Sequence, residues 1–367
     1  MAIQTNEYPA RGYAATSPES GMAPFRFNRR GLRDNDVLID ITHCGICHSD
    51  LHTARNDWGR TVYPVVPGHE IVGTVSAVGD AVTMHRVGDR VAIGCMVDAC
   101  LECDHCKAGL EQYCKNGMTG TYNGKDRQDG TITFGGYSDR IVCREEFVLK
   151  VPEALASDVA APLLCAGITT YSPLRQWKIG PGSKVAVAGL GGLGHMGVKL
   201  AVAMGAEVTV LSRSEDKRAD ALALGAQHFL ITTDKAAMRA AGGQFDMVLN
   251  TIPVRHDVAP YLLLLKIDGV QVLVGMIDKM PELHTGILLG RKILTGSGIG
   301  GLAETQEMLE FCAEHGIAPE IETIAINTVN DAYDRMEASD VKYRFVIDMA
   351  SLAEGSDPLG RGASAAL

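Results

Sequence analysis

The chain has 367 residues, 46% of them hydrophobic and 21% charged, which is typical of a folded protein with more than one core and unlike a disordered one. Its formal net charge of −10 disfavours nucleic acid and anionic lipid as partners. No apolar run reaches the roughly 18 residues of a membrane span, and residues 1–30 lack the apolar segment of a secretory signal. We therefore expect a cytoplasmic protein with no nucleic-acid or membrane partner.

The N-terminal third begins with a short β-rich run at residues 37–41, which leads into a dense cluster of reactive groups at residues 44–52. A Gly-His-Glu sequence follows at residues 68–70, after irregular backbone with two prolines. Residues 71–79 and 87–92 resemble short strands interrupted by glycine. This pattern predicts a small, partly open barrel that presents reactive side chains on its loops.

Four cysteines follow with the spacing C-x2-C-x2-C-x7-C, at Cys100, Cys103, Cys106 and Cys114. Four thiolates satisfy tetrahedral zinc and leave no position for water or substrate, so such a site is structural. Two disulfides are the alternative, which the expected reducing compartment and the two successive x2 spacings disfavour. We expect a structural zinc whose binding stabilises this segment.

The composition changes near residue 157, where the chain becomes rich in Ala, Leu and Gly. Before this change, residues 139–143 are predicted to form another strand. After it, Cys165 lies in an expected apolar helix over residues 165–171. Taken alone, Cys165 would be interpreted as a core cysteine, because unpaired cysteine is among the most buried residue types.

A glycine-rich turn marks the central third. The apolar run at residues 185–188 is followed at once by the G-x-G-x-x-G sequence of residues 189–194, and a helical pattern covers residues 195–204. The motif indicates dinucleotide binding only when a strand precedes it and a helix follows it, because the helix N-terminus can then bind a pyrophosphate. The sequence predicts a dinucleotide site.

The next strand, at residues 207–211, ends at Ser212. Sites selective for NAD usually place a carboxylate near this point to bind the ribose 2′-hydroxyl. Here the polar groups are instead Ser212, Arg213, Ser214 and Lys217, which suit a 2′-phosphate. The alternative is an ordinary solvated helix start. We predict NADP(H) rather than NAD(H).

Further strands complete a predicted six-stranded, doubly wound sheet. They are expected at residues 228–231, 247–250, 270–274 and 293–295. A helix at residues 303–314 then leads to strand-like segments that end at residues 343–348 and are expected to rejoin the N-terminal part. The tail, residues 351–367, has little to bury and is expected to be loose.

These motifs, in this order, resemble the zinc-dependent alcohol dehydrogenases of the medium-chain dehydrogenase/reductase superfamily from about residue 35 to residue 349. The sequence GLGGLGHMG at 189–197 and YRFVID at 343–348 resemble the cinnamyl alcohol dehydrogenase branch, which are NADP-dependent aldehyde reductases. The resemblance implies an α/β protein with a partly open, GroES-like β-barrel catalytic domain and a doubly wound six-stranded Rossmann domain. The catalytic domain would comprise residues 1–158 and 298–367, and the dinucleotide-binding domain residues 159–297.

The resemblance also implies roles for the reactive residues. Cys47, His69 and Cys165 match the ligands of a catalytic zinc, which would give two Zn²⁺ per chain. Glu70 resembles a carboxylate that can bind the zinc when water or substrate leaves. Asp50 resembles a carboxylate that orients His69 without binding the zinc itself. Ser49 and His52 resemble a proton relay, and their spacing of three would place them on one face of a helical turn.

The cofactor and the substrate have expected contacts on the same basis. The family pattern adds His48, Thr169, Val274, Ile299 and Arg344 as contacts of NADP(H). They join the residues already predicted from the motif and the strand end, which are Gly189, Leu190, Gly191, Gly192, Leu193, Gly194, Ser212, Arg213, Ser214 and Lys217. Trp58, Met118 and Ile299 match walls of an apolar pocket for an aldehyde or alcohol. Related sequences commonly carry Phe where this chain has Gly298, and losing this ring should either widen the pocket or free the loop. We therefore expect a broad range of primary alcohols and of aromatic and medium-chain aldehydes.

Several alternatives stay open. His52 could be a surface histidine and Arg344 an ordinary strand arginine. A zinc-free quinone or enoyl reductase of the same superfamily would need no metal ligands, and a cofactor-sensing protein without turnover would need no relay. The resemblance suggests a homodimer or homotetramer built through the cofactor domains. No role is evident for Cys44, Cys95, Cys143 and Cys312.

Overall fold

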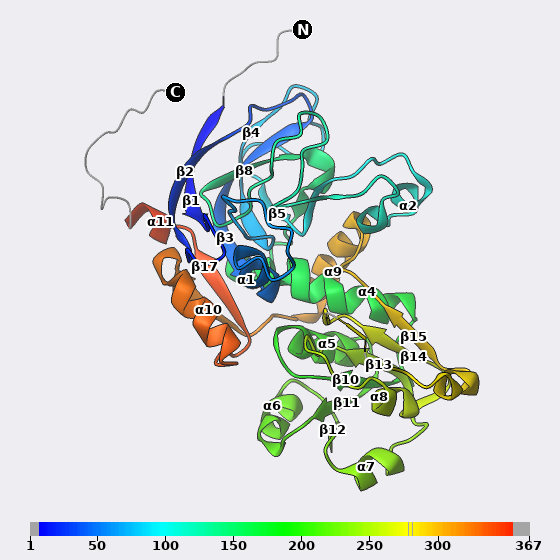
Figure 1. Cartoon of the computed structure of the whole chain (residues 1–367). Helices are drawn as coiled ribbons and strands as arrows, with labels where there is room; N and C mark the ends of the chain where they lie inside the picture. Colours follow the sequence, from blue (N-terminus) through cyan, green and yellow to red (C-terminus); the bar gives the residue numbers. More distant parts are fainter. Residues whose placement is uncertain (1–6, 278, 281, 355–367) are drawn as a thin grey trace.

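The computed structural model describes residues 7–277, 279–280 and 282–354, and it divides most strands between two large sheets. In Figure 1 one sheet lies above the other, and helices α4 (Ile168–Gln176) and α9 (Leu302–His315) lie between them. This arrangement confirms the predicted α/β class with a barrel-like part and a doubly wound part. The exact domain boundaries stay a prediction.

The first large sheet has seven strands and is mostly antiparallel. Its order is β16-β17-β3-β4-β5-β9, with β8 paired to β3. Its strands are β3 (Asp36–Ile46), β4 (Ile71–Val78), β5 (Arg90–Ile93), β8 (Arg140–Arg144), β9 (Leu149–Lys150), β16 (Ile321–Ala325) and β17 (Arg344–Asp348). Because β17 pairs antiparallel with β3, the C-terminal segment does rejoin the N-terminal part, as predicted.

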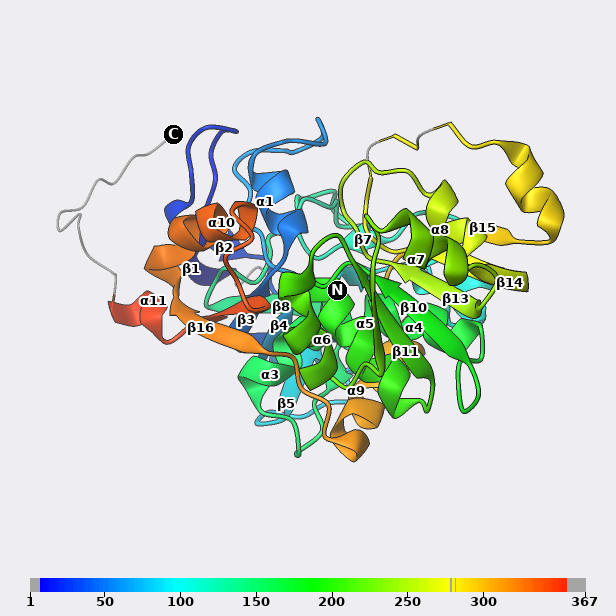
Figure 2. The same ribbon diagram turned by 90° about the horizontal axis from the view of Figure 1, so that it is seen from below.

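The second large sheet is parallel, with the order β12-β11-β10-β13-β14-β15. Figure 2 shows helices packed against it. Its strands are β10 (Lys184–Ala188), β11 (Glu207–Ser212), β12 (His228–Ile231), β13 (Phe245–Asn250), β14 (Leu265–Leu273) and β15 (Ile293–Gly296). The strand order reverses between β10 and β13, which is where ligands of such sheets bind.

The remaining elements cover the two sheets or form small excursions. Two further pairs of strands are β1 (Tyr8–Ala14) with β2 (Ala23–Arg29) and β6 (Met96–Asp98) with β7 (Thr119–Gly120). The other α-helices are α1 (His48–Ala54), α2 (Asp104–Lys107), α3 (Ser157–Pro162), α5 (Gly192–Ala203), α6 (Arg218–Ala223), α7 (Lys235–Ala240), α8 (Ala259–Leu263), α10 (Val329–Glu337) and α11 (Ser351–Glu354). The short helical turns are η1 (Glu111–Tyr113), η2 (Glu145–Phe147), η3 (Leu163–Gly167), η4 (Glu215–Lys217), η5 (Thr285–Gly290) and η6 (Ile326–Thr328).

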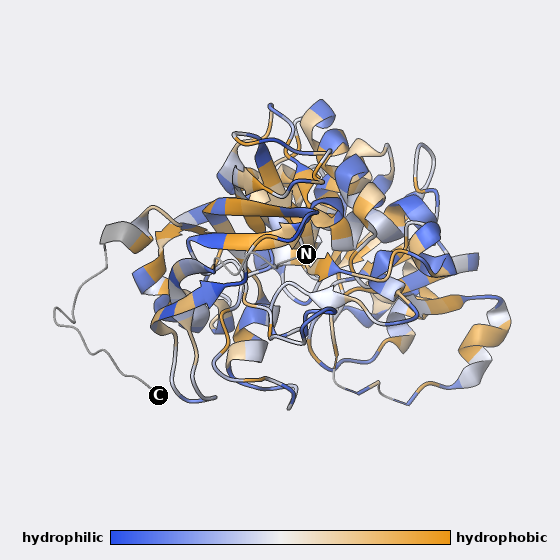
Figure 3. Cartoon of the chain, turned by 90° about the horizontal axis from the view of Figure 1, so that it is seen from above, coloured by the Kyte–Doolittle hydropathy of each residue, from blue (hydrophilic) through white to orange (hydrophobic). Residues whose placement is uncertain are grey.

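Hydrophobic residues are frequent along the strands, whereas the outer helices carry both hydrophobic and hydrophilic residues (Figure 3). The strands β10 and β13 are buried along most of their length, as expected for a parallel sheet covered on both faces. Val346 and Tyr343 of the C-terminal segment belong to the same core cluster as Val187 of β10. The two sheets are therefore joined by a continuous apolar contact.

The segment around Cys165 differs from the prediction. An α-helix was expected over residues 165–171, but Leu163–Gly167 form a turn of π-helix between α3 and α4. Such single wide turns change which way a side chain points within a continuous helix and are frequent at functional sites. Here the turn presents Cys165 toward the cluster of residues 47 and 69.

Three other expectations need correction. The strand predicted at residues 87–92 begins only at Arg90, because Gly88 has a φ of +93° and residues 87–89 form a turn. The β1–β2 hairpin was not predicted. Of the tail predicted to be loose, residues 351–354 form helix α11, while residues 355–367 lie outside the described part of the chain.

Candidate active site

Four residues that could bind one metal ion converge from three segments of the chain. The potential ligand atoms of Cys47, His69, Glu70 and Cys165 all lie within 4.8 Å of one another, and all four residues are enclosed. The Sγ atoms of Cys47 and Cys165 are 3.9 Å apart. Two thiolates on tetrahedral zinc, with Zn–S bonds of about 2.3 Å, would be about 3.8 Å apart. The spacing therefore fits zinc and excludes a disulfide, whose S–S bond is about 2.05 Å.

Asp50 supports this cluster from the first turn of α1. Its carboxylate accepts hydrogen bonds from the backbone N–H of Cys47 (2.8 Å), the N–H of Gly68 (3.1 Å), Nδ1 of His69 (3.1 Å) and the hydroxyl of Tyr137 (3.3 Å). The bond to Cys47 caps the helix, so the C-x-x-D spacing serves fold and site together. Because Nδ1 of His69 is occupied, its Nε2 is the atom left for a metal.

Glu70 is fully buried and forms an ion pair with Arg344 through Oε1. Its other oxygen, Oε2, has no hydrogen-bond partner among the described residues. A buried carboxylate oxygen without a partner is costly unless it binds a cation, so this atom also fits a metal. Gly45 is required beside it, because a Cβ at that position would collide with Oε2.

The thiol of Cys47 is set up as an anionic ligand. Hydrogen bonding with Cys165, together with nearby His69 and Arg344, lowers the pKa of Cys47 well below its ordinary value, although burial opposes this. A thiolate is the form of cysteine that binds zinc. The electrostatics of the cluster therefore favour the metal-binding state.

The second cysteine cluster is separate. The ligand atoms of Cys100, Cys103, Cys106 and Cys114 also lie within 4.8 Å of one another, and the Sγ of Cys106 is 3.9 Å from that of Cys100 and 3.6 Å from that of Cys103. Backbone N–H groups of Glu102 and Cys103 lower the pKa of Cys100 to about 6. The four thiols are unbridged and at zinc-like spacing, so the disulfide alternative does not hold.

The predicted proton relay lies on helix α1. Ser49 is half-buried, and the Nδ1 of His52 is 2.7 Å from the carboxylate of Asp57, which the sequence did not single out. No direct hydrogen bond joins Ser49 to His52 in the described structure. The pair therefore fits the predicted relay only if another group, such as the cofactor ribose, connects them.

The glycine-rich loop has the geometry that dinucleotide binding requires. Gly189 has a φ of +91°, and a Cβ on Gly194 would strike the carbonyl of Gly189. Residues 189–191 carry the chain from β10 into α5, and no side chain of the described residues caps this helix, so its first N–H groups are available to an anion. A Cβ on Gly192 would lie 2.9 Å from Cδ of Arg344, so this arginine links the loop directly to Glu70.

The groups predicted to select NADP(H) lie at the end of β11. Arg213 is exposed, and neither it nor Lys217 makes a side-chain hydrogen bond or ion pair in the described structure. The neighbouring Arg218, in contrast, is paired with Glu215. Two cations without partners at this position fit a 2′-phosphate, and Ser212 provides a hydroxyl beside them.

Comparison with known proteins agrees with this geometry. Residues 33–153 match the model of the alcohol dehydrogenase GroES-like domain, and residues 192–314 match that of the zinc-binding dehydrogenases. An NADP-dependent alcohol dehydrogenase C 1 of Mycolicibacterium smegmatis is 57% identical over 93% of this chain and 98% of its own length. This chain belongs to the zinc-dependent alcohol dehydrogenases.

Two solved structures place it in the cinnamyl alcohol dehydrogenase branch. The enzyme from Sorghum bicolor superposes with a TM-score of 0.91 at 45% identity, covering 96% of this chain and 100% of that one. The enzyme from Helicobacter pylori in complex with NADP(H) superposes with a TM-score of 0.88 at 42% identity, covering 94% and 99%. Zinc and NADP(H) are accordingly the cofactors of this alcohol dehydrogenase.

The remaining cofactor positions of the alcohol dehydrogenase lie along the junction of the two sheets. His48 is exposed at the start of α1, Thr169 is buried in α4, and Val274 follows β14 half-buried. Ile299 has a φ of +46° and packs against the cores of both sheets. These side chains surround the junction, but no hydrogen bond joins them to one another in the described part of the chain, so their cofactor roles stay predictions.

The expected substrate walls differ in exposure. Trp58 is half-buried and lies 5.4 Å from the ring of His52, whereas Met118 is 42% exposed. Apart from Gly298 and its two chain neighbours, no heavy atom of the described residues lies within 4 Å of a Cβ placed on Gly298, so a side chain could start at this position without a collision. The backbone N–H of Gly298 donates to the hydroxyl of Tyr113 (3.1 Å), which ties this loop to the four-cysteine segment.

Sequence reasoning missed a third thiol at the catalytic cluster. Cys95 was given no role, yet hydrogen bonding with Cys165, followed by the influence of His69, lowers its pKa to about 6. It comes from the loop between β5 and β6, 25 residues after Glu70 and 70 residues before Cys165, so only the fold brings it to the cluster. Cys44, Cys143 and Cys312 are buried and belong to the apolar cores.

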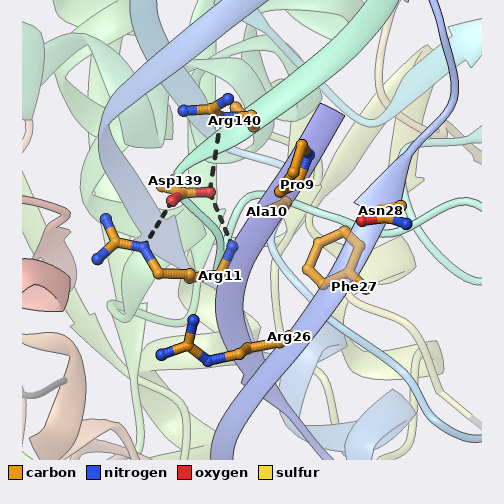
Figure 4. Close-up of a pocket in the computed structure, with 8 residues that line it drawn as sticks. All are labelled: Pro9, Ala10, Arg11, Arg26, Phe27, Asn28, Asp139 and Arg140. Atoms are coloured by element: carbon orange, nitrogen blue, oxygen red, sulfur yellow. Dashed lines mark hydrogen bonds and ion pairs between the residues drawn. The ribbon is translucent and has the colours of Figure 1, made fainter. Parts of the chain in front are cut away.

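A surface pocket of about 580 Å³ lies beside the β1–β2 hairpin (Figure 4). Asp139 accepts hydrogen bonds there from the backbone N–H and Nε of Arg11, at 2.9 and 3.0 Å. None of the predicted site residues lines this pocket. It is therefore distinct from the active site of the alcohol dehydrogenase.

Proposed function

We propose that this NADP-dependent alcohol dehydrogenase works as a broad reductase of aromatic and medium-chain aldehydes, and that in reverse it oxidises primary alcohols with NADP+ as the hydride acceptor. The observation that carries the proposal is the four-residue cluster around Cys47, which fits zinc and is connected through Glu70 and Arg344 to the glycine-rich loop. The metal site and the dinucleotide site are thus connected by the buried ion pair between Glu70 and Arg344. A zinc-free reductase would not need this connection.

The residues divide the work in the following way. Cys47, His69 and Cys165 would hold a zinc ion, which when bound polarises the aldehyde carbonyl while NADPH supplies the hydride. Asp50 keeps the His69 ring in the orientation and tautomer that leave Nε2 available. Ser49 would pass a proton to the nascent alcohol, and the ion-paired His52 would connect it to solvent.

Glu70 and Arg344 would affect how the metal is coordinated during the same reaction. Arg344 pairs with one oxygen of Glu70, and the other oxygen, which belongs to the cluster, has no hydrogen-bond partner among the described residues. The carboxylate is therefore available to the metal when a water or product leaves. Since Arg344 also contacts Gly192, occupation of the pyrophosphate loop and the position of Glu70 would be connected.

A wide pocket follows from Gly298. A Cβ at this position would meet no described neighbour within 4 Å, and the loop has no aromatic side chain at Gly298. The loop is held instead by the hydrogen bond from its N–H to the hydroxyl of Tyr113. One missing or added apolar group changes the discrimination between substrates by about 10–200-fold. We therefore expect cinnamaldehyde, benzaldehyde and C4–C8 aldehydes to be reduced with kcat/KM values within about that range of one another.

A panel of aldehydes assayed with NADPH and NADH tests the proposal. We expect turnover with aromatic and medium-chain aldehydes and a kcat/KM preference for NADPH. Metal analysis of the same preparation should give two zinc ions per chain. The proposal fails if no aldehyde is reduced while quinones or enones are, or if NADH is the better cofactor.

We further propose that the protein acts in the cytoplasm as a homodimer or homotetramer assembled through its cofactor domains. The ten cysteines are all unbridged, and their two clusters need a reducing compartment to bind zinc. Strand β15 is an edge of the six-stranded sheet, and exposed apolar side chains accompany it, including Leu289 (84%) and Met276 (60%). In the described part of the chain, no helix has the length and apolar character needed to cross a bilayer. Light scattering of the purified protein tests the oligomer.

A further inference from the structure

His195 is a fully buried histidine that the mechanism above does not use. It follows the glycine-rich motif directly and lies in the first turns of α5. Burial lowers its pKa to about 4, so the ring is neutral at physiological pH. A histidine is a costly choice for a buried position unless its ring makes specific contacts.

The ring makes two such contacts. Its Nδ1 donates to the carbonyl of Gly191 (3.3 Å), which also accepts the backbone N–H of His195 (3.0 Å). Its face stacks on the ring of Tyr343, with centroids 4.7 Å apart and planes inclined by 10°. His195 therefore contacts the glycine-rich loop through a hydrogen bond from the edge of its ring, and the C-terminal segment through stacking of its ring face on Tyr343.

Tyr343 continues the path toward the metal cluster. It directly precedes Arg344, and its carbonyl oxygen lies 3.5 Å from the Cβ position of Gly192. The backbone N–H groups of both residues donate to the carbonyl of Glu320, at 3.1 and 3.2 Å, so the pair is fixed as a unit. Arg344 then pairs with Glu70.

These groups form one buried row between the two sheets. His195 is 0% exposed, Tyr343 and Arg344 are 5% exposed, and Glu70 is 0% exposed. The row begins at His195 on helix α5, directly after the glycine-rich loop, and passes through Arg344 at the start of β17 to Glu70, which directly precedes β4 of the antiparallel sheet. A change in the ring of His195 would therefore shift the loop relative to Arg344.

We propose that His195 is a positioning residue that sets the glycine-rich loop against Arg344 and Glu70, so that NADPH and the catalytic metal are held at a fixed separation. It would touch neither cofactor nor substrate itself. This role rests on the proposed function for the identity of the cofactor. It goes beyond that function because it assigns to the neutral ring of His195 the relative position of the dinucleotide site and the metal site.

Three substitutions separate the contacts. His195→Leu removes both contacts, His195→Phe keeps a ring to stack but loses the donor, and His195→Asn keeps a donor but loses the ring. Tyr343→Phe is the matched control, because its hydroxyl has no hydrogen-bond partner among the described residues. The assay is NADPH binding to the intact zinc-loaded chain, followed by cofactor fluorescence without aldehyde, so it is independent of turnover.

We expect His195→Leu to raise the Kd for NADPH about tenfold, as expected when one hydrogen bond and one aromatic contact are lost. The Phe and Asn variants should each show an intermediate rise, and Tyr343→Phe should stay within about twofold. In a double-mutant cycle with Arg344→Gln, the effects should be less than additive, because both residues act on one loop. Zinc content should stay at two.

The proposal is overturned if the Leu and Phe variants bind NADPH within twofold of the parent chain, even if their melting temperature falls. It is also overturned if the effects of His195 and Arg344 are strictly additive, or if the variants lose zinc. If the Leu variant does not fold, the Phe and Asn variants decide by the same criteria. Failure of aldehyde reduction in the parent chain would instead refute the proposed function while leaving this binding test intact.

Discussion

Replacing Asp50 by Asn should release the catalytic zinc while leaving the structural zinc bound. The carboxylate accepts four hydrogen bonds, of which those from Cys47, Gly68 and His69 come from N–H groups that can only donate. An amide offers a single oxygen, so in either orientation at least one of these buried donors faces an NH2 group. Leaving one such donor without an acceptor costs about 1–3 kcal/mol.

The substitution also lowers the affinity for the metal, because Asp50 no longer orients His69. Loss of such a support typically lowers metal affinity by about 10–100-fold, which corresponds to roughly 1.4–2.7 kcal/mol. A competitive chelator titration, with zinc counted per chain, should show one zinc released at lower chelator concentration and one unchanged. Asp57→Asn is the matched control, because that exposed carboxylate bonds His52 rather than His69. Identical titrations for Asp50→Asn and the parent chain would refute the reasoning.

Three further predictions concern the cofactor, the pocket and the loop between the sheets. The double variant Arg213→Ala/Lys217→Ala should raise the KM for NADPH by about 30–1000-fold while changing that for NADH little, because each of the two cations contributes about 1–2 kcal/mol to a charge-assisted contact; equal changes for both cofactors would contradict it. Gly298→Phe should fold with an unchanged melting temperature and reduce bulky aldehydes less efficiently, since its Cβ position is open; an unchanged aldehyde profile would show that this loop does not line the pocket. Glu111→Gln should lower the melting temperature by weakening the contact from Glu111 Oε2 to the N–H of Leu302 (3.0 Å), a bond to a charged acceptor worth about 1.5–3 kcal/mol; an unchanged melting temperature would contradict it.

Much of the fold could be predicted because its signals are local. The apolar run before Gly189, the glycine spacing and the helical pattern after it follow one another in the sequence and in the structure. The four-cysteine segment is equally local, since all its thiols lie within fifteen residues. In both cases short loops bring sequence neighbours together, so spacing alone predicts geometry.

The features that sequence reasoning missed depend on long-range packing. Cys95 reaches the catalytic cluster only because β5 and β6 carry it there, and Tyr137 reaches Asp50 across 87 residues. The π-helical turn at Cys165 has no signature in residue pattern, because it differs from an α-helix only by one widened turn. His195 was predicted to be helical, but its stacking on Tyr343 follows from the meeting of two sheets.

The central claim is that one zinc, bound by Cys47, His69 and Cys165, carries the chemistry. The most direct test is the zinc content and NADPH-dependent aldehyde turnover of Cys165→Ser, measured on the same sample. We expect one zinc per chain in place of two and a loss of turnover, with the protein still folded by circular dichroism. Retention of turnover at one zinc per chain would contradict the account.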